Sequence, residues 1–164
     1  MPTFFKLVSI SLCVCAALLS GCGQDDADNL KIPRLMMEVR GVDYSSLNKM
    51  VSVMPISGTK ISLQTDPLVS EFEILNVELV RVDLGLALMV QVSEKGARDL
   101  YRASVSNNGG RVVFMVNGTA IGSRRFDGAI TDGKYYTFVE LPDEELPQLV
   151  LDLKQSIADI QAKK

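Results

Sequence analysis

The sequence contains no histidine and no tryptophan, and it has only three cysteines among its 164 residues. Without histidine the chain lacks the commonest general base and the commonest transition-metal ligand. The formal net charge is −3, and acidic and basic residues are mixed along the chain. A nucleic-acid-binding protein would show a basic face. The composition therefore argues against a histidine-dependent enzyme, a metal site, a cofactor and a nucleic-acid partner.

One short apolar run, from Leu7 to Leu19, follows a single positive charge at Lys6. The run is too short to span a bilayer comfortably and fits the core of a secretory signal peptide. It ends in the letters LSGC, which resemble the lipobox of bacterial lipoproteins. The resemblance implies signal cleavage between Gly21 and Cys22 and a diacylglyceryl group on the Cys22 sulfur. The alternatives are an ordinary signal peptide with an accidental cysteine, or an uncleaved anchor.

The residues after Cys22 read GQDDAD and are too polar to pack against a core. Two or three acyl chains would anchor the protein stably to a membrane, through this polar tether. In double-membraned bacteria, lipoproteins with aspartate directly after the cysteine tend to stay in the inner membrane. Gly23 holds that position here. The resemblance therefore implies a cell-envelope protein that faces the periplasm, with the outer membrane favoured over the inner membrane.

Cys13 and Cys15 would leave with the signal peptide, so Cys22 would be the only cysteine of the mature chain. No disulfide can then form within one mature chain, and packing alone must hold the fold. We divide the chain into a signal peptide (1–21), a tether (22–33), an N-terminal extension (34–59) and an α+β domain (60–164). The extension holds two short apolar runs and four methionines, which either form an adaptable binding surface or, as we favour, fill a core. It either extends a sheet or forms a flap over it.

From Lys60 onward, alternating apolar residues predict strands over 60–66, 72–83 and 84–93. The period then changes to that of a helix that begins after Ser93, a suitable N-cap, and stops at the NNGG of residues 107–110. We expect its buried stripe to consist of Ala97, Leu100, Tyr101, Ser104 and Val105.

Asn117-Gly118 is a strong hairpin signal, and Asp132-Gly133 marks another turn before a strand that alternates from Tyr135 to Leu141. A second amphipathic helix begins near Leu146, and its apolar stripe continues to Ile160. These elements give the order βββαββα. We therefore predict a single α+β domain, in which two amphipathic helices pack on one face of an antiparallel sheet.

The segment from about Lys60 to Ile160 resembles the periplasmic head subdomain of SecD, a subunit of the bacterial protein translocase. The resemblance is carried by LALMVQVSEKGARDLYRASVSNNGGRVVFMVNGTAIGS and then FDGAITDGKYYTFVELPDEELPQLVLDLK. The matching positions are Gly96-Ala97, Gly110, Gly118, Ile130 and Gly133. SecD also carries several membrane-spanning helices and uses the proton-motive force, and this chain has no matching apolar runs. The resemblance therefore implies the fold and the binding habit of the family without its motor.

Three groups of residues are candidate functional sites. Arg124 and Arg125, with Asp127 nearby, offer a cationic contact to a partner or to lipid phosphate, or simply form a solvated turn. Tyr135-Tyr136 offers an aromatic side chain to an extended peptide at a sheet edge, although alternation places one tyrosine in the core. The carboxylates of Pro142–Glu145 are suited to acid-base chemistry or a hard cation, but at a helix start they are more often dipole partners.

None of these groups forms a complete catalytic set, so we do not expect an enzyme. The leading hypothesis is a membrane-anchored, non-enzymatic binding module for extended or unfolded polypeptide, or for a protein-export or envelope assembly. One alternative is a structural adaptor lipoprotein without affinity for polypeptide. Another is a hydrolase that uses Asp143, Glu144 or Glu145 with Ser93 or Ser104. The expected partners are the membrane, through acylated Cys22, and a protein of the envelope.

Overall fold

The computed structural model describes residues 30–39 and 49–164. The predicted signal peptide, its cleavage site at Gly21 and Cys22, and most of the tether therefore lie outside the described residues. The described elements, in chain order, are β1 (Pro33–Met37), β2 (Lys49–Val53), β3 (Lys60–Gln64), η2 (Glu71–Glu73), β4 (Ile74–Val82), β5 (Gly85–Val92), α2 (Glu94–Ser106), β6 (Arg111–Val116), β7 (Thr119–Arg125), β8 (Lys134–Thr137) and α3 (Leu146–Ala162).

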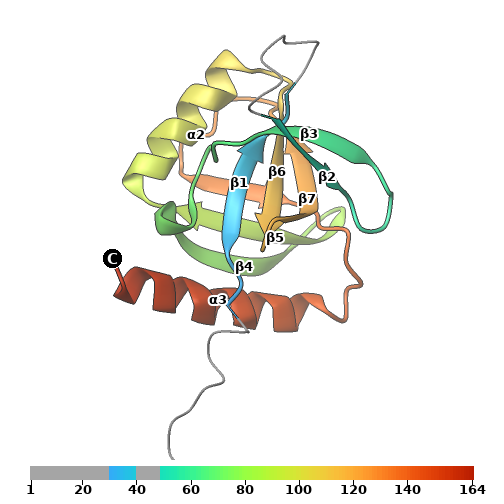
Figure 1. Cartoon of the computed structure of the whole chain (residues 1–164), viewed down its shortest axis with the longest axis vertical. Coiled ribbons are helices and arrows are strands. Elements are labelled where there is room, and N and C mark those ends of the chain that lie inside the picture. Colours follow the sequence, from blue (N-terminus) through green and yellow to red (C-terminus); the bar gives the residue numbers. More distant parts are fainter. Residues whose placement is uncertain (1–29, 40–48) are drawn as a thin grey trace, which may run out of the picture.

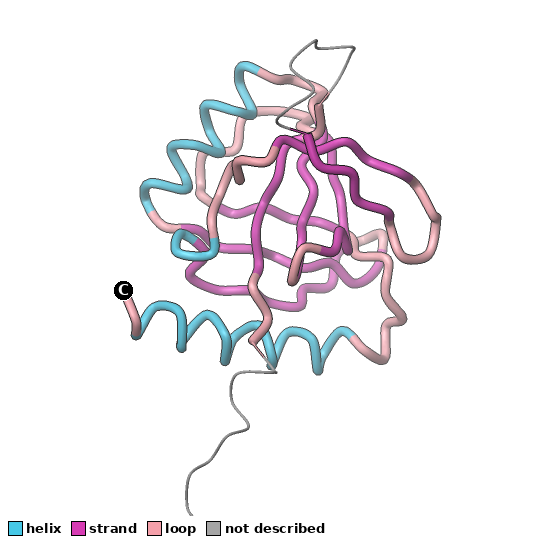
Figure 2. Tube along the Cα trace, viewed as in Figure 1, coloured by secondary structure: helices cyan, strands magenta, loops and turns pink. Residues whose placement is uncertain are grey.

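In the described part of the chain, the strands form two three-stranded antiparallel sheets and one hairpin. The first sheet has the order β1-β6-β7, the second has the order β4-β5-β8, and β2 pairs with β3. The strands of the first sheet run across those of the second, with α2 on one flank and α3 along the lower edge (Figures 1 and 2). The predicted α+β class is confirmed.

The finer prediction of one sheet and the order βββαββα is corrected by this topology. Between α2 and α3 the described chain has three strands, because the Asn117-Gly118 turn joins two full strands, β6 and β7. Asn117 and Gly118 adopt φ angles of 50° and 80°, which suit the tight turn of a two-residue hairpin. The alternating strand predicted from Tyr135 to Leu141 ends at Thr137, and Val139 contributes an isolated bridge.

The larger hydrophobic core lies between the two sheets and receives side chains from both helices. The fully buried residues Leu35 and Phe114 come from the first sheet, and Leu88 comes from the second. Leu100 of α2 and Leu153 of α3 close the same core. Burial of one such side chain typically contributes about 1.5–3 kcal/mol. Both helices therefore stabilise one shared interior, as their amphipathic patterns predict.

A smaller core lies on the opposite face of the first sheet, beneath the β2–β3 hairpin. Successive strand residues point to opposite faces, so Leu35 and Met37 enter the larger core while Met36 enters the smaller one. The members of the smaller core are Met36, Met54, Ile61, Leu63, Val113, Met115 and Ala120, with Met50 partly buried against them. The segment before residue 60 thus supplies both an edge strand, β1, and half of a covering hairpin.

Helix α2 begins as predicted, because the Ser93 side chain accepts a hydrogen bond of 3.3 Å from the backbone N–H of Gly96. Its predicted stripe is partly wrong. Leu100 and Ser104 are buried, but Tyr101 and Val105 are 47% and 57% exposed. Their part of the helix surface therefore faces solvent.

The reason is a close approach at Gly96. A Cβ atom at this position would lie 3.0 Å from the Cβ of Val92 and 3.3 Å from Cγ1 of the core residue Val69, so the side of the helix that carries the glycine faces the core. Leu100 and Ala103 then complete the contact with the core. The buried stripe is predicted from apolar side chains, so Gly96, which has no side chain, is left out of it.

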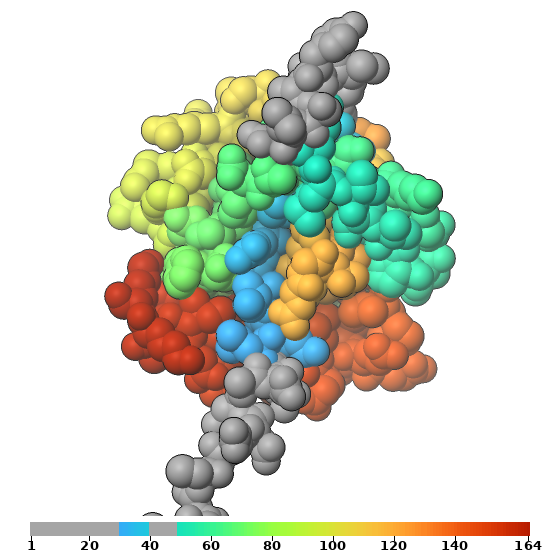
Figure 3. Space-filling view, viewed as in Figure 1, coloured from blue at the N-terminus to red at the C-terminus, as the bar shows by residue number. Residues whose placement is uncertain are grey.

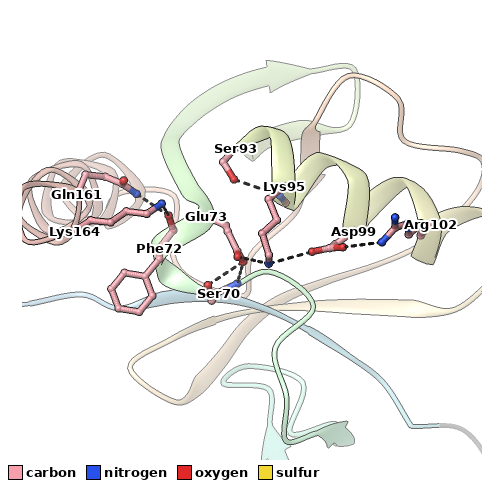
Figure 4. A network of polar contacts seen from close by, with 10 residues as sticks. Ser70, Phe72, Glu73, Ser93, Lys95, Asp99, Arg102, Gln161 and Lys164 are labelled. Carbon is pink, nitrogen blue, oxygen red and sulfur yellow. Dashed lines mark hydrogen bonds and ion pairs between the residues drawn. The ribbon is translucent and has the colours of Figure 1, made fainter.

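Polar contacts from both helices hold the short turn before β4 (Figure 4). The Glu73 carboxylate accepts hydrogen bonds from the backbone N–H and the hydroxyl of Ser70, at 3.0 and 2.9 Å, and from Lys95 of α2. Gln161 of α3 donates to the carbonyl oxygens of Phe72 and Ile74, at 3.1 Å each. The start of β4 is therefore fixed by α2 on one side and by α3 on the other.

The two sheets meet where Gly122 of β7 bridges Val139, just after β8. The backbone N–H of Glu140 donates to the carbonyl oxygen of Ile121 at 2.7 Å in the same place. A Cβ atom at Gly122 would lie 2.6 Å from the carbonyl oxygen of Phe138, which is closer than real Cβ atoms approach. The junction therefore needs a residue without a side chain at position 122.

We predict that Gly122→Ala destabilises the fold, because backbone must move to admit the methyl group. Overpacking of this kind typically costs about 1–3 kcal/mol of unfolding free energy. Gly128→Ala is the matched control, since a Cβ there meets nothing within 4 Å. Urea denaturation of the two variants measures the difference. Equal stabilities for Gly122→Ala and Gly128→Ala would contradict the close junction.

A second prediction concerns acid stability. Arg34 donates two hydrogen bonds of 2.7 and 2.8 Å to Glu71, and they hold the pKa of this carboxyl below its usual range. A depressed folded-state pKa contributes stability above the unfolded pKa, and this stability is lost as the pH falls through the folded pKa. We expect the unfolding free energy to fall more steeply between pH 5 and pH 3 in the wild type than in Glu71→Gln. Parallel pH profiles would show that the ion pair does not stabilise the fold.

Candidate functional site

Strand β8 forms one edge of the second sheet and pairs with β5 alone within that sheet. The backbone N–H of Val92 donates to the carbonyl oxygen of Gly133 at 3.1 Å, so Gly133, Tyr135 and Thr137 direct their backbone groups toward β5. By alternation, the backbone groups of Lys134 and Tyr136 point away from β5. Among the described residues, no strand pairs with this edge before the bridge at Val139.

Two neighbouring hollows lie along this edge, and together we call them the β8 groove. The first has a volume of about 300 Å³ and lies between the end of β7, the loop 126–133 and the start of β8. The second has a volume of about 560 Å³ and is lined mainly by apolar side chains. Arg124, Asp127 and Tyr136 line both hollows, so the two are adjacent.

The apolar wall of the second hollow includes exposed side chains from the β4–β5 hairpin and from the segment that follows β8. Leu84, at the tip of the β4–β5 hairpin, is 85% exposed, and Val82 lies close to it in sequence and is also exposed. Phe138, directly after β8, is 45% exposed and lines the same hollow. Large apolar side chains that share an exposed hollow are typical of a binding surface.

Of the residues proposed from sequence, Arg124, Arg125 and Tyr136 come together at the β8 groove. Arg124 forms an ion pair of 2.7 Å with Asp127, and this hydrogen bond lowers the pKa of the Asp127 carboxyl. Arg125 donates to the carbonyl oxygen of Gly109 at 3.1 Å. The cationic charge of Arg124 is thus largely neutralised within the chain.

Tyr135 is the tyrosine that alternation places in the core, and it is 1% exposed. Its hydroxyl donates to the carbonyl oxygen of Val112 on β6 at 2.9 Å. Burial raises the pKa of this phenol well above its usual range. Its side chain therefore ties β8 to the first sheet, while its neighbour Tyr136 faces the groove.

The carboxylates of Pro142–Glu145 are exposed and lie just before α3. The serines suggested as their partners have structural contacts, since Ser93 caps α2 and Ser104 accepts from the N–H of Ile130 at 3.0 Å. Across residues 30–39 and 49–164, no group of three histidine, cysteine, aspartate or glutamate side chains is placed to hold a metal ion. Within the same residues, no helix is both long enough and apolar enough to cross a membrane.

Sequence reasoning missed Val82, Leu84 and Phe138. The available signal was Leu84, an apolar residue between Asp83 and Gly85 in a turn where polar residues are usual. Phe138 gave no such signal, because the strand predicted to continue through it ends one residue earlier. Which elements line the groove depends on the tertiary fold.

Comparison with known proteins shows a similarity of fold. One similar solved structure is described as SecDF, a membrane component that enhances protein export. It has a TM-score of 0.56 and 15% identity over 83% of this chain and 70% of that chain. Another is SecDF in a super-membrane-facing form, with a TM-score of 0.57, 17% identity, and coverage of 82% of this chain and 21% of that one.

This chain thus covers 21%, about a fifth, of the length of the second SecDF chain. At these identities the likeness shows the fold. The match to the first SecDF structure covers 83% of this chain, which is more than residues 60–164 could provide by themselves. The matched part therefore includes some of the segment before residue 60. No protein-family model and no curated protein matches the chain.

Proposed function

We propose that this protein is a non-enzymatic binding module of the cell envelope, which is anchored to a membrane through lipid on Cys22 and binds extended polypeptide at the β8 groove. The observation that carries the proposal is the outer edge of β8 at Tyr136, which no strand of the described residues pairs, beside an exposed apolar hollow. The protein-export role described for SecDF, which has the same fold, adds support. The lipobox-like LSGC supports a position on the periplasmic side, and Gly23 after it favours the outer membrane.

The free edge offers hydrogen bonds that do not depend on sequence. An extended peptide that adds to a sheet edge pairs its main chain with the outward N–H and C=O groups of that edge. Those of Tyr136 point away from β5, next to the first hollow of the groove. Main-chain pairing suits a partner that presents many different sequences, as an unfolded polypeptide does.

The apolar hollow supplies the second half of the recognition. Alternate side chains of a paired strand point to the same face of the sheet, at a spacing of about 7 Å. A peptide that continues along β8 past Tyr136 reaches the wall formed by Phe138 and Leu84. Large apolar side chains, which a folded protein hides and an unfolded one exposes, would fit this wall best.

The test is binding of a fluorescently labelled, permanently unfolded polypeptide to the full mature chain, followed by fluorescence anisotropy. We expect Leu84→Lys to weaken binding at least tenfold, because it places a charge in the apolar hollow. Val105→Lys on α2 is the matched control, since Val105 is also an exposed apolar residue and does not line the groove. Both positions are exposed, so neither variant is expected to unfold the domain.

Absence of binding by the wild type would overturn the polypeptide-binding proposal in favour of an adaptor without such affinity. Equal weakening by Leu84→Lys and Val105→Lys would show that binding occurs away from the β8 groove.

A further inference from the structure

Another cavity, separate from the β8 groove, lies on the face of the first sheet that carries the smaller core. Its volume is about 500 Å³, and it opens beside the β2–β3 hairpin. We call it the methionine cleft, after an apolar lining that consists of Leu30, Ile32, Met36, Met50 and Met115. Figure 3 shows this side of the molecule, with β1 and the end of β6 visible side by side below the hairpin.

The cleft continues the smaller hydrophobic core. Met36 and Met115 belong to that core, and Met50 packs against it from the start of β2. Methionine side chains are unbranched and flexible, so a surface built from them adapts to the shape of an apolar ligand. A ligand in the cleft would therefore extend an existing apolar layer.

The polar residues around the cleft are already neutralised or engaged within the protein. Arg34, which is exposed, forms its two hydrogen bonds with Glu71. The Asn117 side-chain oxygen accepts from the backbone N–H of Ile32 at 2.7 Å. The cleft thus presents no uncompensated arginine charge, and its chemistry favours a neutral aliphatic ligand over an anion.

The occupant is suggested by how close one lining residue of the cleft lies to Cys22 in the sequence. Leu30 is both part of the lining and the first described residue, eight positions after Cys22. Eight extended residues span about 29 Å at most, so a lipid on Cys22 stays within reach of the cleft. The backbone N–H of Lys31 is fixed to the Ser156 hydroxyl at 2.8 Å, which holds this end of the chain beside the cleft.

We propose that the methionine cleft binds one acyl chain of the protein's own lipid anchor whenever that chain is out of the bilayer. The proposal rests on the proposed acylation of Cys22 and is independent of polypeptide binding at the β8 groove. An acyl chain in water is costly, and the cleft removes one such chain from water without a separate carrier. Met50 of the β2–β3 hairpin forms one wall of the site.

The test uses the mature chain, residues 22–164, which contains every described residue and a single cysteine. A maleimide that carries one hexadecyl chain is attached to Cys22, and hydrogen exchange is compared with the unmodified chain. We expect at least tenfold slower exchange of the amides of β2 and β3 after modification, with the protein still monomeric by light scattering. Unchanged exchange, or slowing that accompanies micelle formation, would overturn the proposal.

Two adjacent residues of β2 provide the matched variants. Met50 lines the cleft, whereas Val51 points to the other side of the strand and is 63% exposed. Each variant is compared with and without the hexadecyl chain, so any effect of the substitution on the hairpin itself cancels. Met50→Glu should abolish the slowing, and Val51→Glu should retain it. Equal slowing in both variants would place the acyl chain elsewhere.

The mass of the protein purified from cells tests the acylation of Cys22, on which both this inference and the proposed membrane anchor rest. An unmodified Cys22 would remove the anchor and with it the natural occupant of the cleft. Loss of polypeptide binding, with the hexadecyl effect intact, would overturn the β8 groove assignment and leave the acyl site standing.

Discussion

The close contact between Gly122 and the backbone at Phe138–Val139 is the constraint on which the arrangement of the two sheets depends. It joins β7 to the end of β8 through a bridge, and the N–H of Glu140 extends the contact to Ile121. The bridge is isolated, and β7 and β8 belong to different sheets. Among the described residues, no strand pairs with the edge of β8 at Tyr136 that faces away from β5, and apolar residues of the β4–β5 hairpin and of the segment after β8 lie beside it.

The same junction also positions the cover of the smaller core. The Glu140 carboxylate accepts hydrogen bonds from the backbone N–H groups of Ile56 and Ser57, at 3.1 and 2.8 Å, at the turn of the β2–β3 hairpin. These donors, led by Ser57, lower the pKa of Glu140. Close to the same turn, near the end of β2, the Ser52 hydroxyl accepts from the N–H of Ala120 at 3.1 Å. The first sheet thus has one face closed by the second sheet and one face closed by a tethered hairpin.

Local features of the fold followed from the sequence because local chemistry determines them. The Ser93 cap, the Asn117-Gly118 turn and the start of α3 at Leu146 each depend on a few neighbouring residues. The division into two sheets depends on strand partners far apart in sequence, such as β1 with β6, and no local pattern encodes it. Arg124 and Tyr136 were proposed from residue type alone, whereas the contribution of Leu84 to the same groove required the tertiary fold.

The central claim is that the open edge of β8 receives extended polypeptide, and cross-linking in living cells tests it most directly. A photoreactive amino acid would replace Tyr136 at this edge, and a second protein would carry it at Val105 on α2. The account predicts cross-links from position 136 to many different envelope proteins in newly exported, unfolded form, and few from position 105. Cross-links from position 136 to a single folded partner, or equal yields from both positions, would contradict it.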